Sequence, residues 1–161
     1  MKTIIIYYGY GNHTRMIAER IKNELECDIL EIKPKIPYST DYQTVVDDNV
    51  ENIQKKETPE IENININLDD YDRVILGTPV WWYTITPPIR TFLSKYDLSS
   101  KTVIPFATNA GWLGSTFEEI KELCNGNVEN EMSIKFTTDY SENKIVTADK
   151  EIEGWINSMK K

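Results

Sequence analysis

Glycine, hydroxyl and aromatic side chains gather in three short stretches of the sequence, Gly9–Thr14, Thr78–Thr86 and Thr108–Ser115. The first stretch reads Gly9-Tyr10-Gly11-Asn12-His13-Thr14. Glycines let the backbone curl tightly, and a helix that starts here would direct N–H groups and positive partial charge toward an anion. Thr14 would add a hydroxyl donor. We therefore predict an anion site in this stretch; the alternative is a plain strand-to-helix turn.

Two nucleotide-binding motifs resemble this stretch only in outline. A dinucleotide fingerprint would need a third glycine where Thr14 stands, and a P-loop would end in Gly-Lys followed by Ser or Thr, so ATP or GTP hydrolysis is not expected. His13 is the only histidine, and no spacing typical of metal ligands surrounds it. No serine or cysteine nucleophile motif is present either. We predict no metal site and no catalytic residue, and a structural or phosphate-contacting role for His13.

The other two stretches predict a site for a flat ligand. Trp81, Trp82 and Tyr83 directly follow a buried strand, and large rings in a surface loop are suited to packing on a planar group, the alternative being a cluster in the core. The third stretch has small residues that let the backbone approach a ligand closely. The predicted contacts from these stretches are Pro79, Val80, Trp81, Trp82, Thr108, Asn109, Ala110 and Gly111. A phosphate cradle beside an aromatic platform describes a flavin site.

Hydrophobic periodicity predicts the elements that position these stretches. Apolar runs predict strands over Ile4–Tyr8, Ile29–Ile32, Val74–Gly77, Thr102–Thr108 and Met132–Phe136. Apolar residues at helical spacing predict helices over Ile17–Leu25, Ile89–Tyr96, Ser115–Gly126 and Ile152–Met159, with a surface helix inside Pro37–Glu57. We predict an α/β fold: a three-layer sandwich around a five-stranded parallel sheet in 2-1-3-4-5 order, as a single domain over residues 1–161. Ligands of such sheets bind beyond the carboxyl ends of the strands, where the three stretches lie.

Local signals add three expectations. Pro105 falls in the middle of a predicted strand, which conflicts with its missing N–H. Ser115 with Glu118 three residues later predicts a capping box at a helix start. Gly126 is expected to end that helix.

The composition limits the classes of function. The chain has 161 residues, 40% of them hydrophobic, and a formal net charge of −8. Such a surface would repel nucleic acid and attract a basic partner protein. No apolar run approaches the roughly 20 residues that span a bilayer, no signal peptide is apparent, and Cys27 and Cys124 are expected to be reduced thiols. We expect a cytoplasmic protein with no nucleic-acid or membrane partner.

The three stretches together resemble the flavodoxins, in particular a short-chain flavodoxin-like group, over nearly the whole chain. Tyr7–Arg15 is similar to that group's phosphate loop, usually Ser-x-Thr-Gly-Asn-Thr, and Gly77–Trp82 is similar to its Gly-x-Pro-Ile-Trp-Trp segment. Pro87–Leu93 continues that match, and Pro105–Gly111 resembles the third flavin loop. The resemblance implies a flavodoxin-like fold and a bound FMN, with the phosphate on Gly9–Thr14. The isoalloxazine ring would pack against Trp81 or Trp82, and Thr108–Gly111 would line its far edge.

The phosphate loop departs from the family pattern. We align Gly9 and Gly11 with its hydroxyl residues, Asn12 with its glycine and His13 with its asparagine. Asn12 would then adopt the left-handed backbone of that glycine. Hydrogen bonds to charged groups contribute about 1.5–3 kcal/mol each, so two missing hydroxyls would weaken FMN binding by about a hundredfold or more.

Three functions remain open at this stage. The first is an electron carrier that shuttles electrons between redox partner proteins with basic docking surfaces. The second is an NAD(P)H-dependent flavin reductase of quinone-like acceptors, and the short sequence without a nicotinamide-binding segment favours the carrier. The third is a flavin-free binding module whose site has lapsed, because fold alone does not establish function.

Overall fold

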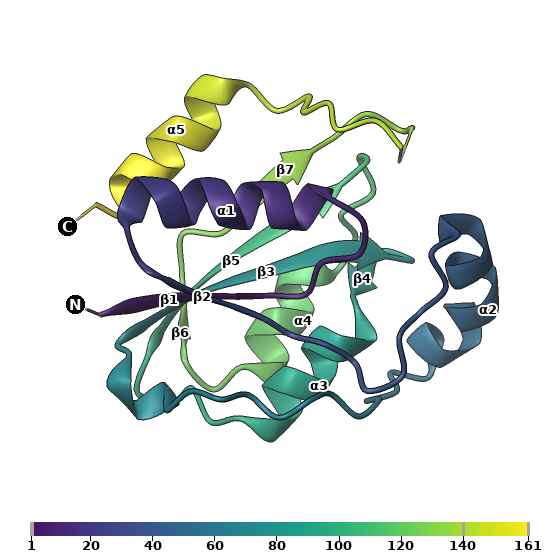
Figure 1. Ribbon diagram of the computed structural model, residues 1–161, viewed down its shortest axis with the longest axis horizontal. Coiled ribbons are helices and arrows are strands. Elements are labelled where there is room, and N and C mark those ends of the chain that lie inside the picture. The colour runs from purple at the N-terminus through teal and green to yellow at the C-terminus, as the bar shows by residue number, and fades with distance from the viewer. Residues whose placement is uncertain (1, 140, 161) are drawn as a thin grey trace.

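A parallel sheet with helices on both faces forms the protein (Figure 1). The computed structural model describes residues 2–139 and 141–160, except for the side chains of Tyr42 and Val46. The strands are β1 (Thr3–Tyr7), β2 (Asp28–Glu31), β3 (Arg73–Trp81), β4 (Thr84–Ile85), β5 (Thr102–Asn109), β6 (Asn127–Val128) and β7 (Met132–Lys135). The helices are α1 (His13–Leu25), α2 (Tyr42–Gln54), α3 (Pro87–Lys95), α4 (Thr116–Leu123) and α5 (Asp149–Ser158), with a short 3-10 turn, η1 (Leu68–Asp70).

The strand order is β2-β1-β3-β5-β6, and these strands run parallel. This confirms the predicted flavodoxin-like order, with one difference at the edge. The fifth position is divided, because β6 pairs with Thr102–Val103 and β7 pairs with Phe106–Asn109 of the same strand β5. The carboxyl ends of β1, β3 and β5 therefore meet at one edge of the sheet, as the sequence predicts.

The divided edge strand also explains Pro105. This proline pairs with Leu76 of β3 on one side of β5. On the other side it falls between the residues paired with β6 and those paired with β7. A missing N–H costs little where the ladder is already interrupted.

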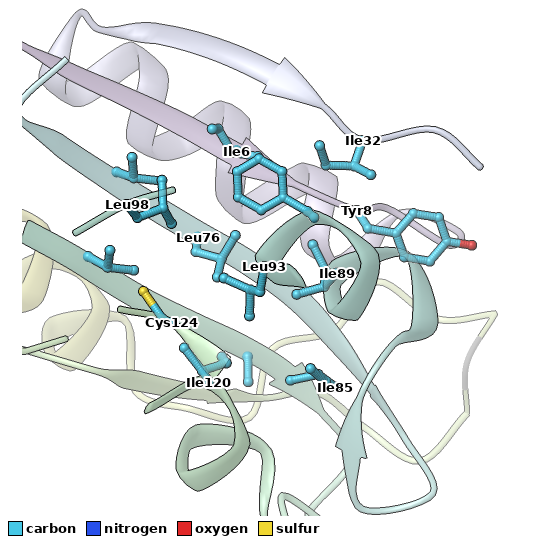
Figure 2. Close-up of a cluster of buried hydrophobic side chains, with 14 of the residues drawn as sticks. Ile6, Tyr8, Ile32, Leu76, Ile85, Ile89, Leu93, Leu98, Ile120 and Cys124 are labelled. Carbon is cyan, nitrogen blue, oxygen red and sulfur yellow. The ribbon is translucent and has the colours of Figure 1, made fainter. Parts of the chain in front are cut away.

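Alternating side chains of the strands build two cores, one on each face of the sheet. Ile5 and Ile75 point toward α1 and α5, where they meet Ile17, Ile21 and Ile152. The neighbouring positions point the other way, toward α3 and α4, and Figure 2 shows this second core. Its members include Ile6, Leu76, Ile89, Leu93 and Ile120. Figure 1 shows α1 and α5 together on one face and α3 and α4 on the other, which gives the predicted three layers.

Helix α2 stands outside these two helical layers (Figure 1), and most of its described side chains are exposed. The predicted surface helix within Pro37–Glu57 therefore exists, but Val45 and Ile53 are buried against the core. Asp41 caps its first turn by accepting a hydrogen bond from the Thr44 N–H at 3.2 Å. Among the described residues, none of the helices is both long and apolar enough to cross a membrane.

Three local predictions were wrong. The stretch Thr78–Thr86 is not all loop, because β3 continues to Trp81 and folds back on β4 as an antiparallel hairpin. Ser115 occupies the N-cap position of α4 but makes no side-chain cap, since its hydroxyl lies 3.4 Å from the Tyr83 carbonyl oxygen. Gly126 does not end α4, which stops at Leu123 with Cys124 as its C-cap.

Candidate functional site

A cavity of about 240 Å³ lies at the carboxyl ends of β3, β5 and β7. Four segments that are distant in sequence form its wall: the start of α1, the β3–β4 hairpin, the end of β5 with the residues after it, and the residues after β7. The lining residues are His13, Pro79, Val80, Trp81, Trp82, Tyr83, Thr108, Asn109, Ala110, Trp112, Phe136, Thr137 and Thr138. The position is the one that the topology of the sheet predicts for a ligand.

The β3–β4 hairpin presents two aromatic rings at its tip. Val80 pairs with Ile85 and Trp81 with Thr84, which leaves Trp82 and Tyr83 as a two-residue turn. Both turn residues have left-handed backbones, with φ of 51° and 66°. Such turns normally use Asn and Gly, and a large side chain there costs of order 1–3 kcal/mol. Trp82 is 42% exposed and Tyr83 52%, so this strained turn holds two rings at the surface beside the cavity.

The segment Ala110–Ser115 between β5 and α4, here the third loop, packs against this tip. Ser115 donates its backbone N–H to the Tyr83 carbonyl oxygen at 2.8 Å. Gly114 has φ of +57°, and a Cβ atom there would lie 2.2 Å from the same carbonyl oxygen. Trp112, in the same loop, is 57% exposed and joins the cavity wall. The tip of the hairpin and the third loop therefore form one unit.

Trp81, in contrast to Trp82, belongs to the core. It is 1% exposed and makes edge contacts with Tyr8, Tyr10 and Tyr38, at centroid distances of 5.9, 5.5 and 5.2 Å. Burial raises the pKa of the Tyr38 hydroxyl to about 12. Trp81 thus fits the alternative of an aromatic core cluster, whereas Trp82 fits the surface platform.

The loop between β1 and α1, Tyr8–Asn12, is here the first loop, and its backbone corrects the alignment with the family pattern. Gly11 has the left-handed φ, +72°, whereas Asn12 has φ of −112° and ψ of −20° at the N-cap of α1. The expectation that Asn12 replaces the family's glycine was therefore wrong. Aligned on the left-handed residue, Gly11 and Asn12 coincide with Gly-Asn of the pattern. Tyr8, Tyr10 and His13 then stand at its three hydroxyl positions.

The polar side chains of this loop are directed to other parts of the protein. The Tyr10 hydroxyl donates a short hydrogen bond to the Ser39 carbonyl oxygen. The His13 ring stacks on Phe136, with centroids 4.0 Å apart and an interplanar angle of 8°, and its Nε2 lies 2.6 Å from the Glu142 carbonyl oxygen. His13 is 7% exposed, and its ring and that of Phe136 form one part of the cavity wall.

Thr14 does not offer its hydroxyl to a ligand, contrary to the prediction. The side chain is fully buried, and its Oγ1 lies 2.7 Å from Oγ1 of Thr108. This hydrogen bond joins the start of α1 to the end of β5. Thr14 therefore links α1 to β5 beside the cavity and does not line the cavity itself.

The structure brings together most of the predicted site residues but not all of them. Eight line the cavity: His13, Pro79, Val80, Trp81, Trp82, Thr108, Asn109 and Ala110. Gly9, Tyr10 and Gly11 border a separate hollow of about 430 Å³ on the other side of the first loop. Asn12 is exposed at the start of α1. Gly111, with φ of +112°, packs beside Lys135. Its backbone N–H donates a hydrogen bond to Oδ1 of Asn109 at 2.9 Å.

Sequence reasoning missed five residues of the cavity wall: Tyr83, Trp112, Phe136, Thr137 and Thr138. Tyr83 and Trp112 fall in the two aromatic stretches but were not chosen as contacts. The last three follow β7 directly, so the rule that ligands sit beyond strand ends, applied to the fifth strand as well, would have found them. Among the residues that the structure describes, no group of His, Cys, Asp or Glu side chains is arranged to hold a metal ion.

Comparisons with known proteins agree with this geometry. A family model described as flavodoxin matches residues 2–159. A putative flavoprotein from Bacteroides eggerthii is 27% identical with a TM-score of 0.77, covering 98% of this chain and 96% of that chain. A flavoprotein from Lactobacillus acidophilus, crystallised in complex with FMN, is 29% identical with a TM-score of 0.70, covering 82% and 91%.

More distant structures share the fold alone. A flavodoxin from Archaea is 17% identical with a TM-score of 0.54, covering 98% of this chain and 92% of that chain. A search among functionally curated proteins gave no match. Since the family model spans nearly every residue, from the first strand to the last helix, the chain belongs to the flavodoxin family.

Proposed function

We propose that this protein binds FMN in the cavity at the carboxyl ends of β3, β5 and β7 and carries electrons between partner proteins. One observation carries the proposal. The exposed rings of Trp82 and Tyr83 line the same cavity as the small residues Thr108–Ala110 at the end of β5. The start of α1, with its positive partial charge, adjoins the same cavity through His13.

The residues present fit a flavin. The cavity is smaller than the roughly 300–1,000 Å³ typical of ligand sites, which suits a flat ring that stays partly open to solvent. Its wall includes Trp81, whose buried Nε1 has no hydrogen-bond acceptor among the described residues. The Lactobacillus flavoprotein crystallised with FMN supports the same ligand for this chain.

FMN, when bound, would supply the redox chemistry, and the protein would position and tune it. Trp82 and Tyr83 would cover one face of the isoalloxazine ring, and Thr108–Ala110 would approach it with backbone groups. Phe136 and His13 would close the side of the cavity nearest α1. No acid, base or nucleophile is required of the chain for simple electron transfer.

The acidic surface favours basic redox partners. The net charge of −8 would steer a positively charged protein toward this one. Asp139 directly follows the cavity-lining residue Thr138, and hydrogen bonds from Ser141 hold the pKa of its carboxyl below the usual range. The carboxylate therefore stays charged beside the mouth of the cavity. A basic partner would be attracted to this carboxylate, and the exposed Trp112 in the cavity wall offers it an apolar contact.

Titration of the flavin-free protein with FMN, followed by flavin fluorescence, tests the proposal. We expect quenching at a one-to-one ratio with micromolar or tighter binding, and weaker binding by a Trp82→Ala variant. An Ile36→Ala variant is the matched control, because Ile36 is 84% exposed and does not border the cavity. Absence of quenching and of any change in the visible spectrum would leave a flavin-free binding module as the function. Rapid oxidation of NADPH by the loaded protein with a quinone would favour the reductase over the carrier.

A further inference from the structure

We infer that the site recognises the ring and ribityl chain of the flavin and gains little from the phosphate, so that riboflavin binds about as tightly as FMN. The inference rests on the proposed flavin site and specifies which part of the ligand the protein reads. It follows from the side chains of the first loop, the charges around it and the contrast with the aromatic hairpin.

Large side chains replace the hydroxyl residues of the family pattern in the first loop. Aligned on Gly11, those positions hold Tyr8, Tyr10 and His13, which are 5%, 9% and 7% exposed. Tyr8 packs edge-on against Trp81 at 5.9 Å, and the Tyr10 hydroxyl is bound to the Ser39 carbonyl oxygen. At two of the three positions, Tyr8 and Tyr10, a ring packed in the core has therefore taken the place of a short donor that could turn toward a phosphate.

His13 and Thr14 lie at the start of α1. The His13 ring is fixed between Phe136 and the Glu142 carbonyl oxygen. The Thr14 hydroxyl is bound to Thr108 and has no access to solvent. Asn12 makes no side-chain cap on α1. An anion at this loop would meet chiefly backbone N–H groups and the weak positive end of the helix.

The cations near the first loop are paired with carboxylates. Arg15 lies beside the loop, but its guanidinium is 2.9 Å from Glu31, and this ion pair offsets much of its charge. Lys35 is similarly placed 3.2 Å from Glu60. Lys33 borders the hollow next to Gly9 and is exposed, so solvent and salt screen its charge. With a net charge of −8 overall, the protein provides little attraction for a phosphate dianion.

The ring end of the site contrasts with the phosphate end. Trp82, Tyr83 and Trp112 remain exposed at the cavity, on a hairpin tip whose backbone is held in an unfavourable conformation. Such strain persists where the surrounding structure enforces it, typically at functional positions. The affinity should therefore come from the aromatic platform, which riboflavin and FMN contact equally.

Paired titrations with riboflavin and FMN test the inference. We expect the two dissociation constants of the unmodified protein to agree within about tenfold, since each hydrogen bond from a side chain to a charged group corresponds to about a tenfold change or more. A preference for FMN of a hundredfold or more would overturn the inference while leaving the FMN proposal intact. Binding of neither flavin would overturn both.

A restored hydroxyl provides the second measurement. The preference is the dissociation constant for riboflavin divided by that for FMN. We expect it to be about tenfold larger in His13→Thr than in His13→Ala. Both variants lose the imidazole ring, so they differ by a hydroxyl and a methyl group. The preference is a ratio within one variant, and it is insensitive to a shared loss of stability. Equal preferences in the two variants would contradict the assignment of His13 to a hydroxyl position of the loop.

Discussion

The hydroxyl groups of Thr14 and Thr108 lie 2.7 Å apart and join the first turn of α1 to the end of β5. Thr14 is fully buried and Thr108 is 3% exposed. Thr14 lies in the helix that follows the first loop, and Thr108 lies at the end of the strand that precedes the third loop. The hydrogen bond therefore fixes the distance between the two loops at a point that solvent does not reach.

Replacement of Thr14 by Val should lower the free energy of unfolding by about 1–3 kcal/mol, because the Thr108 hydroxyl is left buried without a partner. The double variant Thr14→Val/Thr108→Val should lose less than the sum of the two single changes, since it removes both polar groups. Urea unfolding of the flavin-free protein measures all three values. Thr40→Val, at an exposed position, should change stability by less than about 0.5 kcal/mol. Strict additivity of the two buried changes would show that the hydrogen bond does not form.

The ion pair of Arg90 and Glu119 predicts a pH-dependent contribution to stability. The side chains are 7% and 12% exposed, and the guanidinium donates a short hydrogen bond to the carboxylate. Burial alone would raise the pKa of Glu119, but the hydrogen bond from Arg90 and the charge of its guanidinium outweigh burial and lower the pKa. A depressed pKa stabilises the folded state above the unfolded-state pKa, and this contribution disappears as the pH falls through the folded-state value.

Glu119→Gln should therefore cost about 3–5 kcal/mol at pH 7, as expected for breaking a buried pair. The difference from the unmodified protein should stay constant down to about pH 5 and shrink as the pH falls below about 4. Urea unfolding at a series of pH values measures it. Glu122→Gln on the exposed face of the same helix is the control and should have little effect. A cost for Glu119→Gln that did not change with pH would exclude the ion pair as its cause.

The fold follows from the sequence because its signals are local and strong. The run Ile4-Ile5-Ile6 has to be a strand covered on both faces, and Ile17 and Ile21 mark one stripe of a helix; the structure buries all five. The hairpin was missed because Thr78 and Pro79 read as loop residues. Their strand conformation depends on pairing with β5, and the hairpin depends on pairing of Val80 and Trp81 with β4; no local pattern reveals either.

The candidate site was predictable in position and less so in detail. Topology and composition together selected Trp82, Thr108 and Asn109, which line the cavity. The sequence could not show which tryptophan would face solvent, because Trp81 is buried by contacts with Tyr8 and Tyr38 from distant segments. Such contacts depend on tertiary packing and leave no periodic pattern in the sequence.

Gly114 is expected to be essential for the shape of the site. Its backbone is left-handed, and a methyl group would meet the Tyr83 carbonyl oxygen at 2.2 Å. Gly114→Ala should lower the free energy of unfolding by at least about 1–3 kcal/mol and weaken flavin binding by displacing the hairpin tip. Gly154→Ala is a matched control, since that glycine lies in α5 with nothing within 4 Å of an added Cβ. This control should raise stability by about 0.5–1 kcal/mol. Thermal unfolding of both variants compares them, and an unchanged Gly114→Ala protein would contradict the packing of the third loop on the hairpin.

The hairpin tip predicts opposite effects on stability and binding. Asn-Gly is the preferred pair for a two-residue turn with both backbones left-handed, whereas this chain has Trp82 and Tyr83 there, at φ of 51° and 66°. The double change Trp82→Asn/Tyr83→Gly should raise the free energy of unfolding of the flavin-free protein by about 1–3 kcal/mol. The same change removes both exposed rings, so the dissociation constant for FMN should rise about tenfold or more.

Tyr83→Gly alone separates the two effects, since it relieves one strained residue and keeps the Trp82 ring. Its stability and its affinity should both fall between those of the unmodified protein and the double variant. If the double variant lost stability instead, the rings would contribute more to the folded state than the turn costs, and the tip would be part of the core and not a platform held open for a ligand.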